Sequence, residues 1–236
     1  MLDQLDNRFR EAVKSFWEAR EHQLEKQRKA GKVDAGTRGA VTGGTQMGAI
    51  EVLLTDIIVH AGLDLHHVHA GTAVELPGYY RPEKQWDLLV VKDSQLLVAI
   101  ELKSQVGPSF GNNFNNRAEE AIGNADDIWT AYRQGLLGSF PPPFVGYFFL
   151  LEDCGAVHRP LKVREPYFKV DPAFERSSFA QRYEQLCTRL LLERKYSAAC
   201  VTLSPEGSNQ VSFPSQTLSF ERFAASLHAH AGTFVG

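Results

Sequence analysis

Apolar residues recur at intervals of three or four near the start of the chain, and a highly charged tail follows them as far as residue 31. These apolar residues are Leu2, Leu5, Phe9, Val13 and Phe16. The spacing predicts an amphipathic helix over residues 1–30. A Gly-rich connector comes next. Apolar positions between Thr45 and Ala61 then predict a second helix, with Gly62 as its stop.

The next part of the chain has the pattern of short strands separated by turns. A possible strand lies near residues 63–70, a turn-rich stretch covers 75–85, and a further strand is expected at 86–93. The sequence KDSQ at 92–95 is a plausible hairpin turn, and it leads into an alternating strand at 98–105.

The clearest helix in the sequence follows a loop that is expected over residues 106–117. Its apolar face carries Ala118, Ile122, Ala125, Trp129 and Tyr132. Asn116, with Glu119 three residues later, makes a capping box that would begin this helix. The wholly apolar run at 144–153 then suits a buried central strand.

This order of helix, strand, two-stranded hairpin, helix and strand predicts an α/β fold with a central mixed β-sheet flanked by helices. Beyond it we expect a helix near 174–195, a strand at 197–204 and a short C-terminal helix. A chain of 236 residues is expected to form one domain. That domain would comprise the N-terminal helix at 1–30, a core at about 42–152 and an extension at 155–236.

Composition narrows the class of protein. The net charge of −3 and the pI of about 6.2 give no global basic field, although a local basic groove is compatible with them. Three cysteines without a CxxC pair argue against a disulfide framework and for a reducing compartment. The N-terminus is too charged for a signal peptide, and no apolar run approaches the length of a membrane span. We therefore expect a cytosolic protein.

Polar residues on one face of the 98–105 strand raise the question of chemistry. Glu101, Lys103 and Gln105 alternate with the apolar residues of that strand. Partner positions across the hairpin should add up to about 187 or 188, which places Asp87 opposite Ile100 or Glu101. Two carboxylates crowded together repel each other unless a cation lies between them. Hard oxygen ligands favour Mg²⁺, and a nearby ammonium group can orient a water molecule or stabilise charge on a phosphoryl oxygen.

These residues resemble a known signature. Asp87, thirteen intervening residues and then Glu101-Leu102-Lys103 resemble the PD-(D/E)xK nuclease motif, with Trp86 in place of the proline. The stretch ELKSQVGPSFGNNFNNRAEEAIGNADDIWTAYRQG is similar to the type II restriction endonucleases of the XhoI family, and the likeness runs over nearly the full chain. The fold would then be a restriction-endonuclease-like core.

The resemblance implies a homodimer that binds the palindrome CTCGAG and cuts both DNA strands with Mg²⁺, leaving a 5′ overhang. It also implies a prokaryotic cytoplasm and a companion DNA methyltransferase. The amphipathic N-terminal helix is a candidate for part of the dimer interface, although packing on its own core is the expected use of that face. Two other functions stay open: a repair or recombination nuclease with looser specificity, and a DNA-binding module without catalysis.

The expected roles follow from the resemblance. Asp87, Glu101 and the Leu102 carbonyl would hold Mg²⁺, and Lys103 would activate or orient the attacking water. Glu51 lies at the edge of the apolar stripe of its helix, where the superfamily often places a glutamate near the metal. It could be a second-site ligand or a water orienter. The alternatives are a surface ion pair on a solvated sheet for Glu101 and Lys103, and an ordinary surface position for Glu51.

Several further side chains could touch DNA. Asn pairs with adenine and Arg with guanine in the major groove, which singles out Asn112, Asn113, Asn115, Asn116 and Arg117. Loop and cap chemistry is the alternative for these Asn residues, and we expect one or two of the five side chains to touch DNA. Gln105 could touch the water or a phosphate. Arg38, like the basic residues Lys26, Arg28, Lys29 and Lys32, could position phosphates. A solvated helix end explains the last four equally well.

Four histidines gather at His60, His66, His67 and His69. They lack the cysteines or the HxxxH spacing of a tight zinc site, so we expect histidines of strands and turns without a metal.

Overall fold

The computed structural model describes residues 4–29, 44–139 and 141–235. Its α-helices are α1 (Leu5–Lys29), α3 (Gly48–His60), α4 (Phe110–Arg133), α5 (Phe179–Leu192) and α6 (Phe220–Gly232). Short 3₁₀ helices are η2 (Gly44–Met47), η3 (Leu65–His67), η4 (Pro172–Phe174) and η5 (Gln216–Leu218). The strands are β1 (Val68–Ala70), β2 (Glu75–Pro77), β3 (Glu83–Gln85), β4 (Leu88–Lys92), β5 (Gln95–Gln105), β6 (Phe144–Glu152) and β7 (Ala198–Ser204).

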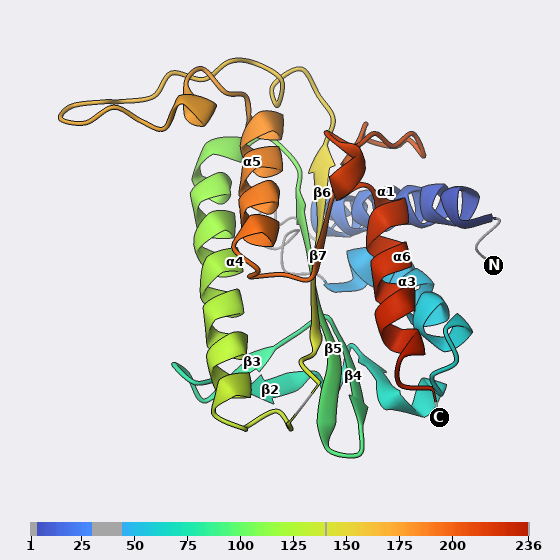
Figure 1. Cartoon of the computed structure of the whole chain (residues 1–236). Helices are drawn as coiled ribbons and strands as arrows, with labels where there is room; N and C mark the ends of the chain where they lie inside the picture. The colour runs from blue at the N-terminus through green and yellow to red at the C-terminus, as the bar shows by residue number, and fades with distance from the viewer. Residues whose placement is uncertain (1–3, 30–43, 140, 236) are drawn as a thin grey trace.

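The central sheet has five strands in the order β1-β4-β5-β6-β7. The strands β1, β4 and β5 are antiparallel neighbours, whereas β5, β6 and β7 run parallel. Figure 1 shows this sheet edge-on, with α4 and α5 on one side and α1, α3 and α6 on the other. The predicted α/β class with a mixed, helix-flanked sheet is therefore confirmed, and the strands expected at 86–93, 98–105, 144–153 and 197–204 are present.

The β4–β5 hairpin turns at Asp93 and Ser94, as the sequence predicts. Both residues have positive φ angles, 52° and 61°, a combination that matches the right-handed twist of the flanking strands. Leu88 pairs with Ile100, and the register shifts once between Val90 and Val91. This register sets which polar residues meet at the far end of the hairpin.

Side chains on the two faces of the sheet pack into two separate hydrophobic cores. Val98, Ile100 and Leu102 of β5 pack against α1, α3 and α6, while Ala99 points to the α4 and α5 side. In the N-terminal helix, the Phe9 ring stacks on Phe220 with 3.9 Å between the centroids. The apolar face of α1 is thus used within the chain's own core.

The start of α4 differs from the prediction. The expected loop at 106–117 ends early, because the helix begins at Phe110 after Ser109. The capping box at Asn116 and Glu119 is therefore wrong. Asparagine favours turns in short peptides, but here burial of the Phe110 ring extends the helix over the asparagine-rich segment.

Smaller details of the fold also differ from the prediction. Ile122 was expected on the apolar face of α4 but is 40% exposed, and Ala121 is buried in its place. The turn-rich stretch at 75–85 contains the β2–β3 hairpin, in which Leu76 pairs with Lys84. Helix α5 begins at Phe179 rather than near 174. Among the described helices, none is long and apolar enough to cross a membrane.

Replacing Gly146 with alanine is expected to destabilise the protein by about 1–3 kcal/mol, the usual cost of overpacking. A Cβ at this position of β6 would lie 2.9 Å from ring atoms of both Phe144 and Phe223. Urea unfolding measures the loss. The matched control is Gly123→Ala on α4, where a Cβ meets nothing within 4 Å and the better helix propensity should stabilise slightly. Equal effects of the two substitutions would contradict this packing.

Candidate active site

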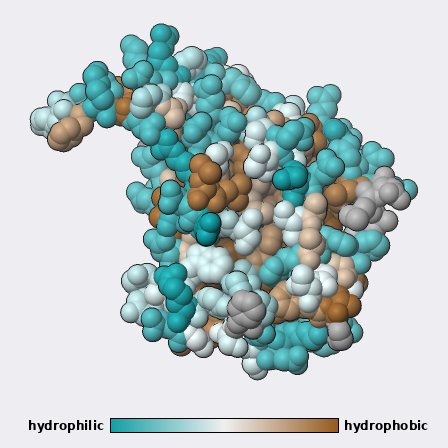
Figure 2. Space-filling model, viewed as in Figure 1, coloured by the Kyte–Doolittle hydropathy of each residue, from teal (hydrophilic) through white to brown (hydrophobic). Residues whose placement is uncertain are grey.

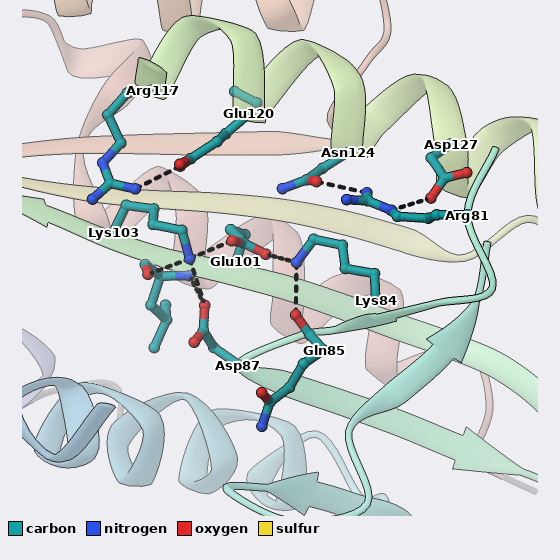
Figure 3. Close-up of polar contacts among 12 residues, drawn as sticks. Arg81, Lys84, Gln85, Asp87, Glu101, Lys103, Arg117, Glu120, Asn124 and Asp127 are labelled. Carbon is teal, nitrogen blue, oxygen red and sulfur yellow. Dashed lines mark hydrogen bonds and ion pairs between the residues drawn. The ribbon is translucent and has the colours of Figure 1, made fainter. Parts of the chain in front are cut away.

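The hairpin brings Asp87, Glu101 and Lys103 together, as the sequence predicts (Figure 3). Asp87 comes just before β4, and its backbone N–H donates to the Ile100 carbonyl at 3.2 Å. The Leu102 N–H donates to Asp87 Oδ2 at 2.7 Å. Glu101 and Lys103 project from β5 on the same side. Backbone pairing therefore fixes the separation of the two carboxylates.

Three oxygen atoms converge on the ammonium group of Lys103. Its Nζ forms an ion pair with Glu101 Oε1 and lies 3.4 Å from Asp87 Oδ2 and 3.3 Å from the Leu102 carbonyl oxygen. These are the three oxygens that the sequence analysis expected to hold a metal ion. Two carboxylates and a carbonyl around one cation are also the kind of donors that a hard divalent ion prefers. The donor set therefore fits such an ion.

Glu101 is a buried charge with more than one cationic partner. It is only 2% exposed, so the alternative of a solvated ion pair on an open sheet is wrong. Burial alone would raise the pKa of Glu101, but the Lys103 and Lys84 ammonium groups outweigh it and lower that pKa. Glu101 therefore stays ionised. Burial raises the pKa of Asp87, helped by the Glu101 charge and opposed by Lys103.

Lys84 is a member of this cluster that sequence reasoning missed. Its Nζ lies 2.5 Å from Glu101 Oε2, 2.7 Å from the Gln85 carbonyl oxygen and 4.4 Å from the centroid of the Trp86 ring. The sequence did contain a signal for this contact, because Lys84 lies only three residues before Asp87. Classing the 75–85 stretch as a turn obscured it, because a turn gives no register with Glu101.

Glu51 comes from α3, on the other side of the sheet, and lines one small pocket with Asp87, Trp86 and Lys103. Partial burial, together with the negative charge of Asp87, raises the pKa of Glu51 to about 7. Glu51 is thus a third carboxyl group, on the Asp87 side of the cluster, near the metal position that the sequence predicts.

Replacing Glu51 with glutamine is expected to remove a pH dependence of stability. The folded protein binds the Glu51 proton with a pKa of about 7, whereas the ordinary value is 4.5. Folded protein therefore holds more protons than unfolded protein between these values, and the wild type should lose stability as the pH rises through this window. Urea unfolding at pH 5 and pH 8 tests this, with the exposed Glu11→Gln as control. Identical pH dependence in wild type and Glu51→Gln would contradict it.

Two residues that the sequence suggested as possible DNA or phosphate contacts are Gln105 and Arg38. Gln105 is 3% exposed; it accepts a hydrogen bond from the Tyr183 hydroxyl and donates one to the Phe110 carbonyl at 2.9 Å. This buried amide joins β5, α4 and α5, so the idea that it touches water or phosphate does not fit. Arg38 lies outside the described residues, as does Lys32.

The asparagine-rich segment forms the first two turns of α4 instead of a loop. Asn113 donates to the Ser109 carbonyl oxygen at 2.7 Å, while Asn115 and Asn116 are exposed. Arg117 forms an ion pair with Glu120 at 2.5 Å and is close enough to Lys103 for its charge to act on that ammonium group. Nothing is described of the Asn112 side chain.

The histidines that sequence analysis singled out engage nearby groups. His66 Nδ1 lies 2.7 Å from Asp64 Oδ1, and its ring centroid is 3.7 Å from that of His67. His60 lies near His228, with 5.7 Å between the ring centroids. Within the described ranges, no three or more His, Cys, Asp or Glu side chains are grouped so that they could hold a metal ion.

The order of elements and the placement of the acidic cluster are consistent with a restriction-endonuclease-like core. Comparison with known proteins supplies the family. Residues 26–215 match the family model described as restriction endonuclease XhoI. The chain belongs to this family.

Three relatives bear this out. The chain is 45% identical to "Type II restriction enzyme BstVI" of Geobacillus stearothermophilus over 85% of this chain and 93% of that protein. It is 44% identical to "Type II restriction enzyme XhoI" of Xanthomonas vasicola, over 81% and 77%. It is 47% identical to "Type II restriction enzyme AbrI" of Azospirillum brasilense, over 71% and 76%. No solved structure was found to match the chain. Type II restriction enzymes are site-specific deoxyribonucleases, and they generally need a divalent metal ion.

Proposed function

We propose that this protein is a type II restriction endonuclease that cleaves double-stranded DNA at the palindrome CTCGAG, with Mg²⁺, to leave 5′-phosphate ends on a 5′ overhang. One observation carries the proposal. Glu101 Oε1, Asp87 Oδ2 and the Leu102 carbonyl oxygen all converge on the ammonium group of Lys103. Membership of the XhoI family supports the choice of substrate and site.

In this mechanism Asp87, Glu101 and the Leu102 carbonyl would hold the metal ion. When bound, the ion would supply Lewis-acid stabilisation of negative charge on the phosphate and would lower the pKa of a water molecule. The Lys103 ammonium group contacts these same three oxygens in the structure, so it would move aside for the metal ion, and from there it would orient the attacking water or neutralise developing charge. Glu51 borders the same pocket, where it would orient a water molecule or serve a second metal ion. Attack is in line and leaves a 3′-hydroxyl.

Contacts to DNA would come from the first turns of α4. Arg117 is the residue of that segment whose charge acts on Lys103, so it lies near the position of the scissile phosphate in this proposal. Asn115 and Asn116 are exposed on the same turns and could read base edges. Asn112, Asn113 and Arg38 stay candidates from the sequence.

We also propose that the protein acts as a C2 homodimer, since a palindrome presents the same base edges twice about a two-fold axis. One site then cuts each strand. Each copy of residues 1–236 would act as one domain, and two hydrophobic cores that share one sheet support this. Light scattering with and without a CTCGAG duplex measures the assembly. A persistent monomer on DNA would contradict it.

The family further supports a role in the prokaryotic cytoplasm beside a companion DNA methyltransferase. Digestion of a plasmid of known sequence in Mg²⁺ tests the proposed activity. Discrete fragments that end at CTCGAG are expected. Smearing would indicate a nuclease with looser specificity, and intact plasmid would indicate a DNA-binding module. Either of these results would overturn the proposal.

A further inference from the structure

Lys84 divides the two oxygens of Glu101 between two cations. Glu101 Oε2 lies 2.5 Å from Lys84 Nζ, while Oε1 pairs with Lys103. The Lys84 side chain is 11% exposed and that of Glu101 is 3% exposed, so this ion pair is screened little by water. Because Lys84 pairs with one carboxylate oxygen of Glu101, only the other oxygen is available to the site formed by Glu101, Asp87 and the Leu102 carbonyl.

The β2–β3 hairpin that carries Lys84 is itself fixed to α4. Asp127 accepts hydrogen bonds from the backbone N–H groups of Tyr79 and Tyr80 at 2.8 and 2.9 Å and from Arg81 Nε at 2.7 Å. Asn124 accepts a further one from Arg81 at 2.8 Å. Figure 3 shows this anchor and the Lys84–Glu101 pair side by side beneath α4. The turn of the hairpin, which lies a few residues before Lys84, is therefore fixed to α4.

We infer that Lys84 is a positioning residue: it fixes Glu101 so that Oε1 is presented to the divalent metal of the proposed function, on which this inference rests. Lys84 pairs with Oε2 of Glu101 whereas Lys103 pairs with Oε1, and this separates the two roles. Partners that orient a metal ligand typically change metal affinity by about 10–100-fold when they are removed.

The test compares Lys84→Gln with Lys84→Arg, which keeps a cation, and with Lys14→Gln on the exposed face of α1. Binding of Mn²⁺ to the protein–duplex complex is measured by electron paramagnetic resonance, and the Mg²⁺ concentration for half-maximal cleavage is measured separately. Lys84→Gln should weaken Mn²⁺ binding and raise the half-maximal Mg²⁺ concentration by about tenfold or more. Saturating Mg²⁺ should recover most of the rate. Lys84→Arg should stay within about threefold of the wild type, and Lys14→Gln should have no effect.

Unchanged Mn²⁺ affinity in Lys84→Gln would overturn the inference, and so would a loss of rate that saturating Mg²⁺ does not recover. If Lys84→Gln does not fold, Asp127→Asn tests the same idea, because it loosens the hairpin without touching the ion pair. Weaker Mn²⁺ binding in that variant is expected, and unchanged binding would count against the inference. Failure of the proposed function is recognised separately: wild-type protein would then leave CTCGAG uncut, or Glu101→Gln would bind Mn²⁺ normally.

A second inference concerns the segment between β6 and α5, residues 155–177, which we call the arm. Figure 1 shows it reaching outward beyond the ends of α4 and α5, and Figure 2 shows that its surface is largely hydrophilic with an apolar outer end. Tyr167 and Phe168 are 88% and 87% exposed. Glu165 closes the turn behind them, since it accepts from the Val170 N–H at 2.9 Å and from Lys169 Nζ at 2.8 Å.

Positive charge dominates the arm once its ion-paired side chains are set aside. Glu165 is paired with Lys169, and Asp171 is paired with Arg189 of α5. Its exposed cations without an ion-pair partner among the described residues are Arg159, Lys162, Arg164 and Arg176. The only acidic side chain left against them in the arm is Glu175. The whole chain carries a net charge of −3, so this local excess is not a general property of its surface.

The arm also begins at the end of the sheet that carries the candidate active site. Lys103 pairs with Phe149 and Gln105 with Leu151 in the parallel β5–β6 ladder, and β6 ends one residue later at Glu152. We propose that the arm binds the phosphate backbone of double-stranded DNA outside the cut site. Its charge complements a polyanion, and base-independent phosphate contacts would position the duplex.

The double variant Lys162→Ala/Arg164→Ala tests this, with Lys14→Ala as control. DNA affinity is measured against salt concentration for a CTCGAG duplex and for an unrelated duplex, in Ca²⁺ to prevent cleavage. Affinity should fall for both duplexes alike, and the slope of log affinity against log salt should shrink by about two. An unchanged slope would overturn the proposal. If Tyr167→Ala/Phe168→Ala instead converts a dimer into monomers, the arm is a protein interface and the proposal also fails. Cleavage by wild-type protein is judged separately, so the proposed function can stand when the arm does not.

Discussion

Replacing Lys103 with alanine is expected to reduce DNA cleavage by about a thousandfold or more, because the group that orients the water or neutralises developing charge is lost. The protein should stay folded, since Glu101 keeps its ion pair with Lys84. Cleavage of a CTCGAG plasmid under single-turnover conditions measures the loss, and circular dichroism checks the fold. The exposed Lys14→Ala is the matched control. A Lys103→Ala variant that cuts at a near wild-type rate would show that the site assignment is wrong.

Glu101→Ala should abolish cleavage in the same way, but with a different effect on DNA binding. It removes a negative charge that faces a polyanion, so binding without metal should be unchanged or tighter. Lys103→Ala removes a positive charge and should not strengthen binding. The comparison separates a metal ligand from a phosphate-facing cation. Weaker metal-independent binding by Glu101→Ala would contradict its proposed role.

Chelation by EDTA is expected to stop cleavage completely and to leave the fold intact. The oxygens of the site are held by strand pairing and by Lys84 and Lys103, and the two hydrophobic cores are built from apolar side chains. A metal that serves catalysis therefore contributes little to folding, unlike a structural zinc ion. Thermal unfolding with and without EDTA is the measurement, and added Mg²⁺ should restore activity. Unfolding on chelation would redirect attention to a structural metal site.

The strands and their register could be predicted because the two-residue period and the hairpin turn are local signals. The sequence allowed Asp87 to lie opposite Ile100 or Glu101. Because Leu88 pairs with Ile100, Asp87 lies beside Glu101. The start of α4 was not predictable in the same way. Asparagines and a Gly-Pro pair locally favour a loop, and burial of Phe110 in the second core overrides that preference.

The contacts of the candidate site could likewise be predicted only where the residues lie on one hairpin. Asp87, Glu101 and Lys103 lie on one hairpin, so their proximity follows from sequence spacing. Lys84 reaches Glu101 from a separate hairpin that is anchored to α4 through Asp127, and no local pattern encodes that contact. The burial of Gln105 likewise depends on Tyr183, which is 78 residues away in the sequence.

Mapping the cut ends on a defined duplex tests the central claim most directly. A duplex with one CTCGAG sequence, labelled in turn on each strand, is digested in Mg²⁺ by wild-type protein and by Lys103→Ala. We expect the wild type to cut both strands at symmetric positions within CTCGAG, leaving 5′ overhangs with 5′-phosphates, and the variant to leave both strands intact. Cuts outside that sequence, cuts on one strand only, or equal cutting by the variant would contradict the account.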